Sequence, residues 1–124
     1  MTPRCEQRLK GVHPDLAWVI RTAAEAYAPK EFIVTEGLRT AARQAELVAA
    51  GASRTMNSRH LTGHAVDLAV KVGSEVRWDW PLYSALAEIV KQVAVGLNVP
   101  IVWGGDWKSF KDGPHYELDR KTYP

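Results

Sequence analysis

Two kinds of apolar spacing alternate along the chain, and each predicts a different secondary structure. Apolar residues recur at helical intervals in three stretches, 15–28, 41–50 and 81–97. Thr40 precedes the second stretch as a residue able to cap a helix, and Pro81 suits the first position of the third. We therefore expect three helices separated by segments of another kind.

Short apolar runs between and after these helices predict strands. They lie at 32–35, 65–70, 101–103 and 115–118, and each is too short for a stable helix. Residues 51–64 are rich in Gly, Ser, Thr, Asn and His and predict a loop. Because the connections are short, the strands are expected to form a small, mainly antiparallel sheet packed against the helices, which is an α+β fold.

Length and composition limit the remaining choices. The chain has 124 residues, so we expect a single domain, 1–124. Its one cysteine, Cys5, excludes an internal disulfide framework and a cysteine-rich zinc module. No apolar run approaches the roughly 20 residues of a membrane span. A net charge of +2, without a clustered basic stripe, gives little support to nucleic-acid binding. We expect a monomer with no nucleic-acid partner and no stable membrane association.

The chain contains five tryptophans, which is a high number for its length. Trp18 falls on the first predicted helix and is expected in the core. Trp103 and Trp107 flank a Gly-Gly turn and are candidates for the wall of a substrate groove, although packing is the ordinary role of such side chains.

Imidazoles and carboxylates occur together in two segments, SRHLTGHAVD and DGPHYEL. A catalytic zinc ion needs three nitrogen or oxygen ligands and one open position. His60, Asp67 and His115 can meet that need, because a glycine turn after His60 folds it back beside the strand that carries Asp67. The alternative is that these are ordinary core or surface histidines, which are more common than ligands.

His64 lies four residues after His60, a spacing that is also found in zinc-binding helices. Gly63 is a poor residue for a helix interior, and no Glu follows His60. We therefore expect His64 beside the site or facing the substrate, and not as a metal ligand.

The pattern S-x-H-x-x-G-x-A-x-D, which begins at Ser58, resembles that of the VanY-like D-Ala-D-Ala carboxypeptidase superfamily of zinc peptidases. The stretches GVHPDL, EGLRT, WGGDW and DGPHYEL are similar to its phage L-alanyl-D-glutamate endopeptidase branch, small endolysins that cut peptidoglycan stem peptides. The resemblance covers about residues 8–118. It implies a Hedgehog/DD-peptidase-like fold, and the length leaves no room for a separate wall-binding domain.

The resemblance also implies roles for individual residues. One zinc ion per chain would be held by His60, Asp67 and His115. Asp112, three residues before the last ligand, would be the general base, although Asp-Gly-Pro is also ordinary turn chemistry. Arg39 would bind the substrate and stabilise the oxyanion, with a solvated surface arginine as the alternative.

Three further residues are expected around this site. Glu117 shares a strand face with His115 and is therefore a competing base, but we rank it as the partner that orients a ligand imidazole. Ser58 resembles a family position that hydrogen-bonds near the metal, and no G-x-S-x-G turn marks it as a nucleophile. Gln44, one turn into the second helix, is expected to support the site.

These expectations combine into a zinc endopeptidase that cuts the L-Ala–D-Glu bond of peptidoglycan stem peptides and lyses the host cell. No apolar signal segment is visible in residues 1–10, so we expect synthesis in the host cytoplasm and action on the wall after holin-type release. Two alternatives remain: a D-Ala-D-Ala carboxypeptidase with the same metal site, and a non-catalytic, zinc-stabilised wall-binding domain. The second would need neither Asp112 nor Arg39.

Overall fold

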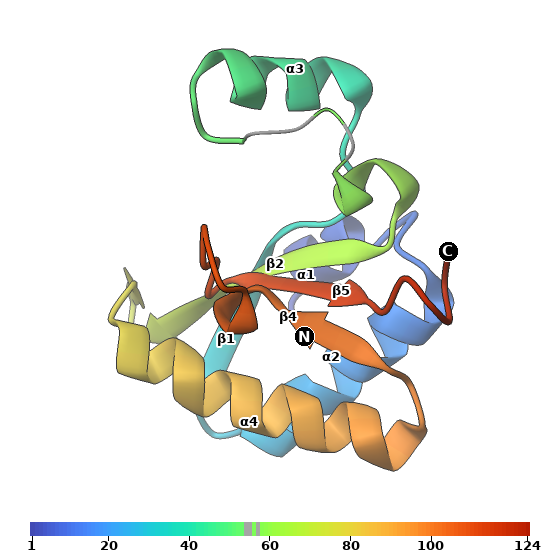
Figure 1. Ribbon diagram of the computed structural model, residues 1–124. Helices are drawn as coiled ribbons and strands as arrows, with labels where there is room; N and C mark the ends of the chain where they lie inside the picture. The colour runs from blue at the N-terminus through green and yellow to red at the C-terminus, as the bar shows by residue number, and fades with distance from the viewer. Residues whose placement is uncertain (54–55, 57) are drawn as a thin grey trace.

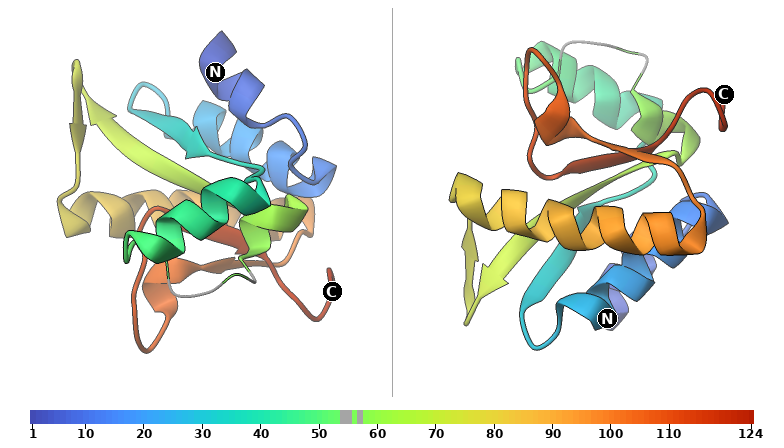
Figure 2. Two further views of the ribbon diagram at one scale, coloured as in Figure 1. Left: turned by 90° about the horizontal axis from the view of Figure 1, so that it is seen from above. Right: turned by 60° about the horizontal axis from the view of Figure 1, so that its bottom comes forward.

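A computed structural model describes residues 1–53, 56 and 58–124 (Figure 1). The described strands form one antiparallel sheet in the order β1-β2-β5-β4, and β3 pairs with the far end of β2. Helices α2 and α4 pack side by side on one face of the sheet, and α3 stands on the opposite side (Figures 1 and 2). The predicted α+β fold with a mainly antiparallel sheet is confirmed. The strands are β1 (Glu31–Glu36), β2 (Ala65–Val72), β3 (Glu75–Arg77), β4 (Ile101–Trp103) and β5 (His115–Leu118).

The three predicted helices are present with nearly the expected limits. They are α2 (Pro14–Tyr27), α3 (Ala41–Ala49) and α4 (Trp80–Leu97). Thr40 caps α3, since its side-chain oxygen accepts a hydrogen bond from the backbone N–H of Arg43. His13 caps α2, since its Nδ1 accepts a hydrogen bond from the backbone N–H of Asp15.

The structure also contains short elements that the apolar spacing does not predict. They are α1 (Pro3–Arg8), β3, and the 3₁₀ turns η1 (Arg59–Thr62) and η2 (Gly104–Asp106). Of the predicted loop 51–64, residues 54, 55 and 57 lie outside the described residues, and η1 replaces loop over four positions. Elements of three to six residues are too short for a periodic pattern to stand out.

The core lies between the sheet and the helices α2 and α4. Each fully buried aliphatic side chain contributes roughly 1.5–3 kcal/mol to folding. Trp18 is an exception to the prediction: it is 50% exposed, so its expected place in the core is wrong. Its neighbours in the helix define the inward face, and Trp18 projects away from it. The core includes Leu16, Val19 and Ile20 of α2, Leu86 and Val90 of α4, and Leu68 and Val70 of β2.

Strand register brings the predicted site residues together. β2 and β5 pair so that Asp67 lies opposite His115. At the other edge of β2, the pairing with β1 shifts register between Val34 and Glu36, which places Glu36 opposite Asp67. Irregularities of this kind commonly re-aim side chains beside active sites. Asp67 is therefore flanked by functional side chains from both neighbouring strands.

The turn at Gly63 places the remaining predicted ligand. Gly63 ends η1 with a φ of 75°, a left-handed conformation that favours glycine. Its carbonyl oxygen accepts a 2.8 Å hydrogen bond from His13, and a side chain at this position would collide with the backbone of Gly11. The turn returns the chain into β2, so that His60 lies beside Asp67.

None of the described helices is long and apolar enough to cross a membrane.

Candidate metal centre

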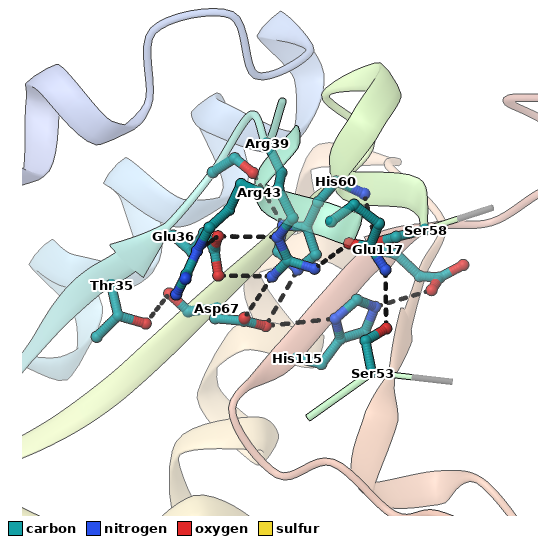
Figure 3. A network of polar contacts seen from close by, with 12 residues as sticks. Thr35, Glu36, Arg39, Arg43, Ser53, Ser58, His60, Asp67, His115 and Glu117 are labelled. Atoms are coloured by element: carbon teal, nitrogen blue, oxygen red, sulfur yellow. Dashed lines mark hydrogen bonds and ion pairs between the residues drawn. The ribbon is translucent and has the colours of Figure 1, made fainter. Parts of the chain in front are cut away.

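Three side chains from separate elements meet at one point of the sheet. His60 comes from η1, Asp67 from β2 and His115 from β5 (Figure 3). Their ligand atoms all lie within 4.8 Å of one another. Asp67 Oδ1 is 3.3 Å from His60 Nε2 and 3.3 Å from His115 Nδ1. Both imidazoles are buried, so the cluster faces solvent on one side only.

The two separations measured from Asp67 Oδ1 fit a tetrahedral metal site. Metal–ligand bonds of about 2.0–2.2 Å in a tetrahedron place neighbouring ligand atoms about 3.3–3.6 Å apart. Asp67 Oδ1 is also buried with no hydrogen-bond partner among the described residues. A buried carboxylate oxygen between two imidazole nitrogens is an environment that a cation satisfies.

The outer nitrogen of each imidazole has a hydrogen-bond acceptor. His60 Nδ1 donates to the carbonyl oxygen of Gly37 at 2.8 Å, and His115 Nε2 donates to Glu117 Oε1 at 2.8 Å. These bonds leave the other ring nitrogen, the one that faces Asp67, free to bind a metal. Glu117 thus contacts His115 as the sequence analysis expects.

The neighbouring charges within the cluster shift the pKa values of Asp67 and His115. Burial opposes ionisation of Asp67, but the imidazoles of His115 and His60 hold its pKa well below the ordinary value. Burial also disfavours charge on His115, but the carboxylates of Asp67 and Glu117 outweigh it and raise the pKa of His115 to about 9. Binding of a metal at the cluster therefore displaces a proton.

Arg39 is held rigidly beside the cluster. Its Nε and Nη2 donate to the two carboxylate oxygens of Glu36 at 2.8 and 2.5 Å, and its Nη1 donates to Gln44 Oε1 at 2.7 Å. Nη2 also lies 3.7 Å from Asp67 Oδ2. Gln44 continues the network by donating from Nε2 to Ser53 Oγ. The bidentate pair with Glu36 fixes the plane of the guanidinium group.

Glu36 belongs to the network but was not singled out in the sequence. It stands in the EGLRT stretch, three residues before Arg39. The i, i+3 spacing of opposite charges was a possible clue. Its position opposite Asp67, however, depends on the register shift in β1, which apolar spacing does not reveal.

Asp112 lies in the turn that leads into β5 and lines the same cleft as the metal cluster. The backbone N–H of Asp112 donates to the carbonyl oxygen of Gly104, and its own carbonyl oxygen accepts from the N–H of His115. A side chain at Gly104 would collide with that carbonyl group, so η2 and the turn are closely packed. Burial raises the pKa of Asp112, and the negative charge of Asp67 adds to the effect.

The cleft around these residues has a volume of about 540 Å³. Trp107 forms part of its wall, with its ring centroid 5.0 Å from that of His115, whereas Trp103 is buried and does not line it. Ser58 lines the cleft and accepts a hydrogen bond from the N–H of His60. The lining includes Arg39, Arg59, His60, Asp67, Trp107, Phe110, Asp112, His115, Glu117 and Arg120.

The structure does not bring His64 to this cleft. Its Nδ1 is 2.6 Å from Thr62 Oγ1, and its ring centroid is 5.7 Å from that of His13, outside the cleft lining. Gln44 does not line the cleft either, but reaches it through Arg39. The other predicted site residues all line the cleft.

Known proteins resemble the chain over its whole length. A sequence model of the family described as phage L-alanyl-D-glutamate peptidase matches residues 1–124. An L-alanyl-D-glutamate peptidase of Listeria phage A118 is 40% identical over 75% of this chain and 32% of its own length. One of Escherichia phage T5 is 33% identical over 95% of this chain and 88% of its own length. The chain thus spans about a third of the first relative and most of the second.

Two solved structures share the fold. The Serratia marcescens L-Ala D-Glu endopeptidase ChiX is 48% identical, with a TM-score of 0.92, over 100% of this chain and 92% of its own. The vancomycin resistance D,D-dipeptidase VanXYg is 17% identical, with a TM-score of 0.58, over 86% of this chain and 50% of its own. At 17% sequence identity, the similarity to VanXYg shows a shared fold only.

Proposed function

The chain belongs to the phage L-alanyl-D-glutamate peptidase family, and on that premise we propose that it hydrolyses the L-Ala–D-Glu bond of peptidoglycan stem peptides. The observation that carries the proposal is the cluster of His60, Asp67 and His115, whose ligand atoms lie within 4.8 Å of one another in the wall of an open cleft. A peptidase needs such a cleft beside its reactive group, because the substrate must reach it.

We propose one zinc ion per chain, held by the two imidazoles and the carboxylate of this cluster. The donor set of two nitrogens and one oxygen suits a catalytic zinc with a position left open. When bound, zinc supplies Lewis acidity and lowers the pKa of a water ligand towards about 7. His60 and His115 stay oriented for this task through their bonds to Gly37 and Glu117.

Asp112 is proposed as the general base. Its carboxylate accepts the proton of the attacking water and then transfers it to the nitrogen of the leaving amine. Its place in the cleft and its raised pKa support this role, since a carboxyl group with a raised pKa is a better proton acceptor. The turn that carries Asp112 leads directly into the strand that carries His115, which keeps the two groups in fixed relation.

Arg39 is proposed to bind the substrate and to stabilise the oxyanion that forms at the scissile carbonyl. Three of the five N–H groups of its guanidinium are used by Glu36 and Gln44, which leaves two for a ligand. Because these bonds fix the group before the substrate arrives, it needs little reorganisation during the reaction. Ser58 and Gln44 support His60 and Arg39 respectively.

The site of action proposed for this enzyme is the bacterial cell wall, where it acts as an endolysin. We further propose that it works as a monomer, is made in the host cytoplasm and reaches the wall after holin-type release. Its proposed partner is the peptidoglycan stem peptide, with no nucleic acid and no stable membrane association.

Digestion of purified muropeptides followed by mass analysis tests the proposed bond. The expected products are free L-Ala-terminated fragments and peptides with a new amino terminus at D-Glu. Release of D-Ala from the end of the stem would instead indicate a D-Ala-D-Ala carboxypeptidase. Binding without any new fragment, in the presence of added zinc, would indicate a wall-binding domain.

A further inference from the structure

The described lining of the cleft contains three arginines, and two of them are already engaged. Arg39 is buried between Glu36 and Asp67, so its charge is compensated within the protein. Arg59 is also largely buried, with 11% of its side chain exposed. Its Nη2 donates to the backbone carbonyl oxygens of Leu118 and Tyr123 at 3.2 and 2.6 Å. Arg59 thus serves the protein's own structure, and Arg39 is held in place for the oxyanion role proposed above.

Arg120 differs from these two arginines. Its side chain is 67% exposed, and Glu117 is its only polar partner in the part of the chain that the structure describes. That contact is long, 3.4 Å from Nε to Glu117 Oε2, and it leaves both terminal nitrogens of the guanidinium group available. The planar fork of Nη1 and Nη2 suits a carboxylate, which it can bind with two parallel hydrogen bonds.

Arg120 lines the same cleft as the proposed metal ligands. Glu117 binds Arg120 through Oε2 and His115 through Oε1, so a single carboxylate separates Arg120 from a proposed metal ligand. A stem peptide bound at the metal centre lies in this cleft and can therefore reach the guanidinium group of Arg120.

The proposed substrate carries a negative charge at the corresponding place. A D-Glu residue is joined onward through one of its two carboxyl groups and keeps the other as a free carboxylate. This carboxylate is only a few bonds from the scissile nitrogen, so it enters the cleft with the reacting amide. Inside a partly enclosed cleft it needs a cationic partner, because loss of water around a carboxylate is costly.

We infer that Arg120 binds the free carboxylate of the D-Glu residue and thereby selects for an acidic residue on the leaving-group side of the scissile bond. This inference rests on the proposed function and adds a specificity-determining residue to it. Arg39 fixes the oxyanion, and Arg120 fixes the substituent next to the leaving nitrogen.

Two synthetic stem peptides that differ in one group test this inference. One carries the free carboxylate on D-Glu, and the other carries a carboxamide in its place. The wild-type enzyme is expected to cut the acid form with a kcat/KM roughly tenfold higher, mainly through KM, because the interaction is present before the chemical step. The variant Arg120→Gln should lose this preference, and Arg120→Lys should restore part of it.

Lys121→Gln is the matched control, because it removes one positive charge from the next position, outside the cleft lining. It should keep the wild-type preference. Equal kcat/KM for acid and amide in the wild type, or a preference retained in Arg120→Gln, would overturn the inference. So would an equal loss of kcat on both peptides together with weaker metal binding, since Arg120 would then act only through Glu117. If the wild type cuts neither peptide at this bond, the proposed function itself fails.

Discussion

Trp103 donates its indole N–H to the carbonyl oxygen of Gly113 at 2.7 Å, and this buried bond ties the end of β4 to the turn that carries Asp112. The indole ring is itself enclosed: Trp80 stacks on it, and the ammonium group of Lys91 lies 5.1 Å from its centroid. A residue outside the cleft lining thus holds the segment on which the proposed base stands.

Replacement of Trp103 by Phe tests this relationship. The change keeps an aromatic ring but leaves the buried Gly113 carbonyl without its donor, at a cost of about 1–3 kcal/mol. We expect a lower Tm and a lower kcat, with the metal content unchanged. Trp18→Phe, at a half-exposed site, should alter neither property. Unchanged kcat in Trp103→Phe would show that the turn holds Asp112 without this bond.

Asp112→Asn should lower kcat by roughly 10²–10⁴-fold, because an amide cannot accept the proton of the attacking water. Asp112→Ala should be at least as severe. Metal stoichiometry, measured by atomic spectroscopy, should stay near one per chain, because Asp112 is not among the proposed ligands. Wild-type turnover in either variant would assign the base elsewhere, with Glu117 the next candidate.

Glu117→Gln should weaken metal binding by about 10–100-fold, because the carboxylate that orients His115 and makes it a stronger ligand is lost. Competition with a chromophoric chelator measures this affinity. Glu75→Gln, on the exposed strand β3, is the control and should bind metal like the wild type. Equal affinity in both variants would contradict the orienting role.

Removal of the metal should abolish activity and lower stability together. Prolonged treatment with EDTA is expected to end peptidoglycan hydrolysis, and addition of zinc should restore it. A ligand present at about one hundred times its Kd stabilises the native state by about 2.7 kcal/mol, so Tm should rise when zinc is returned. Activity that survives chelation would refute the zinc proposal.

Gln44→Ala tests the coupling between α3 and the cleft. Within α3, all of which the structure describes, Gln44 is the one buried residue, and it bonds to Arg39. We expect faster amide hydrogen exchange in α3 and a kcat/KM about tenfold lower, because a hydrogen bond to a charged group is lost. Gln92→Ala, on the exposed side of α4, should change neither. Normal exchange in Gln44→Ala would mean that α3 is anchored by other contacts.

Much of the fold could be predicted because its longer elements carry clear periodic patterns. The approximate limits of α2 and α4 follow from apolar spacing, together with Pro81 at the start of α4. Trp18 was misplaced because residue type alone does not tell which side of a helix faces the core. The family resemblance carried by GVHPDL, EGLRT, WGGDW and DGPHYEL is confirmed by the match over the whole chain.

The proximity of the candidate site residues was predictable where they are close in sequence or fall within a motif. His60 and Asp67 are separated by one turn, and His115 joins them because β5 pairs with β2. Glu36 and Arg120 were missed for different reasons. The position of Glu36 opposite Asp67 depends on a register shift in β1. The position of Arg120 in the cleft lining depends on the path of the chain after β5. Neither position can be predicted without the tertiary structure.

The place of β5 in the sheet has a consequence for both the fold and the proposed metal site. β5 is the last strand in the chain but lies in the sheet interior, between β2 and β4, and it carries His115. The pairing of β5 with β2 and β4 therefore closes the sheet and places His115 opposite Asp67, so the fold and the proposed metal site depend on the same strand. Loss of this pairing would therefore open the sheet and also remove a proposed metal ligand from the cluster.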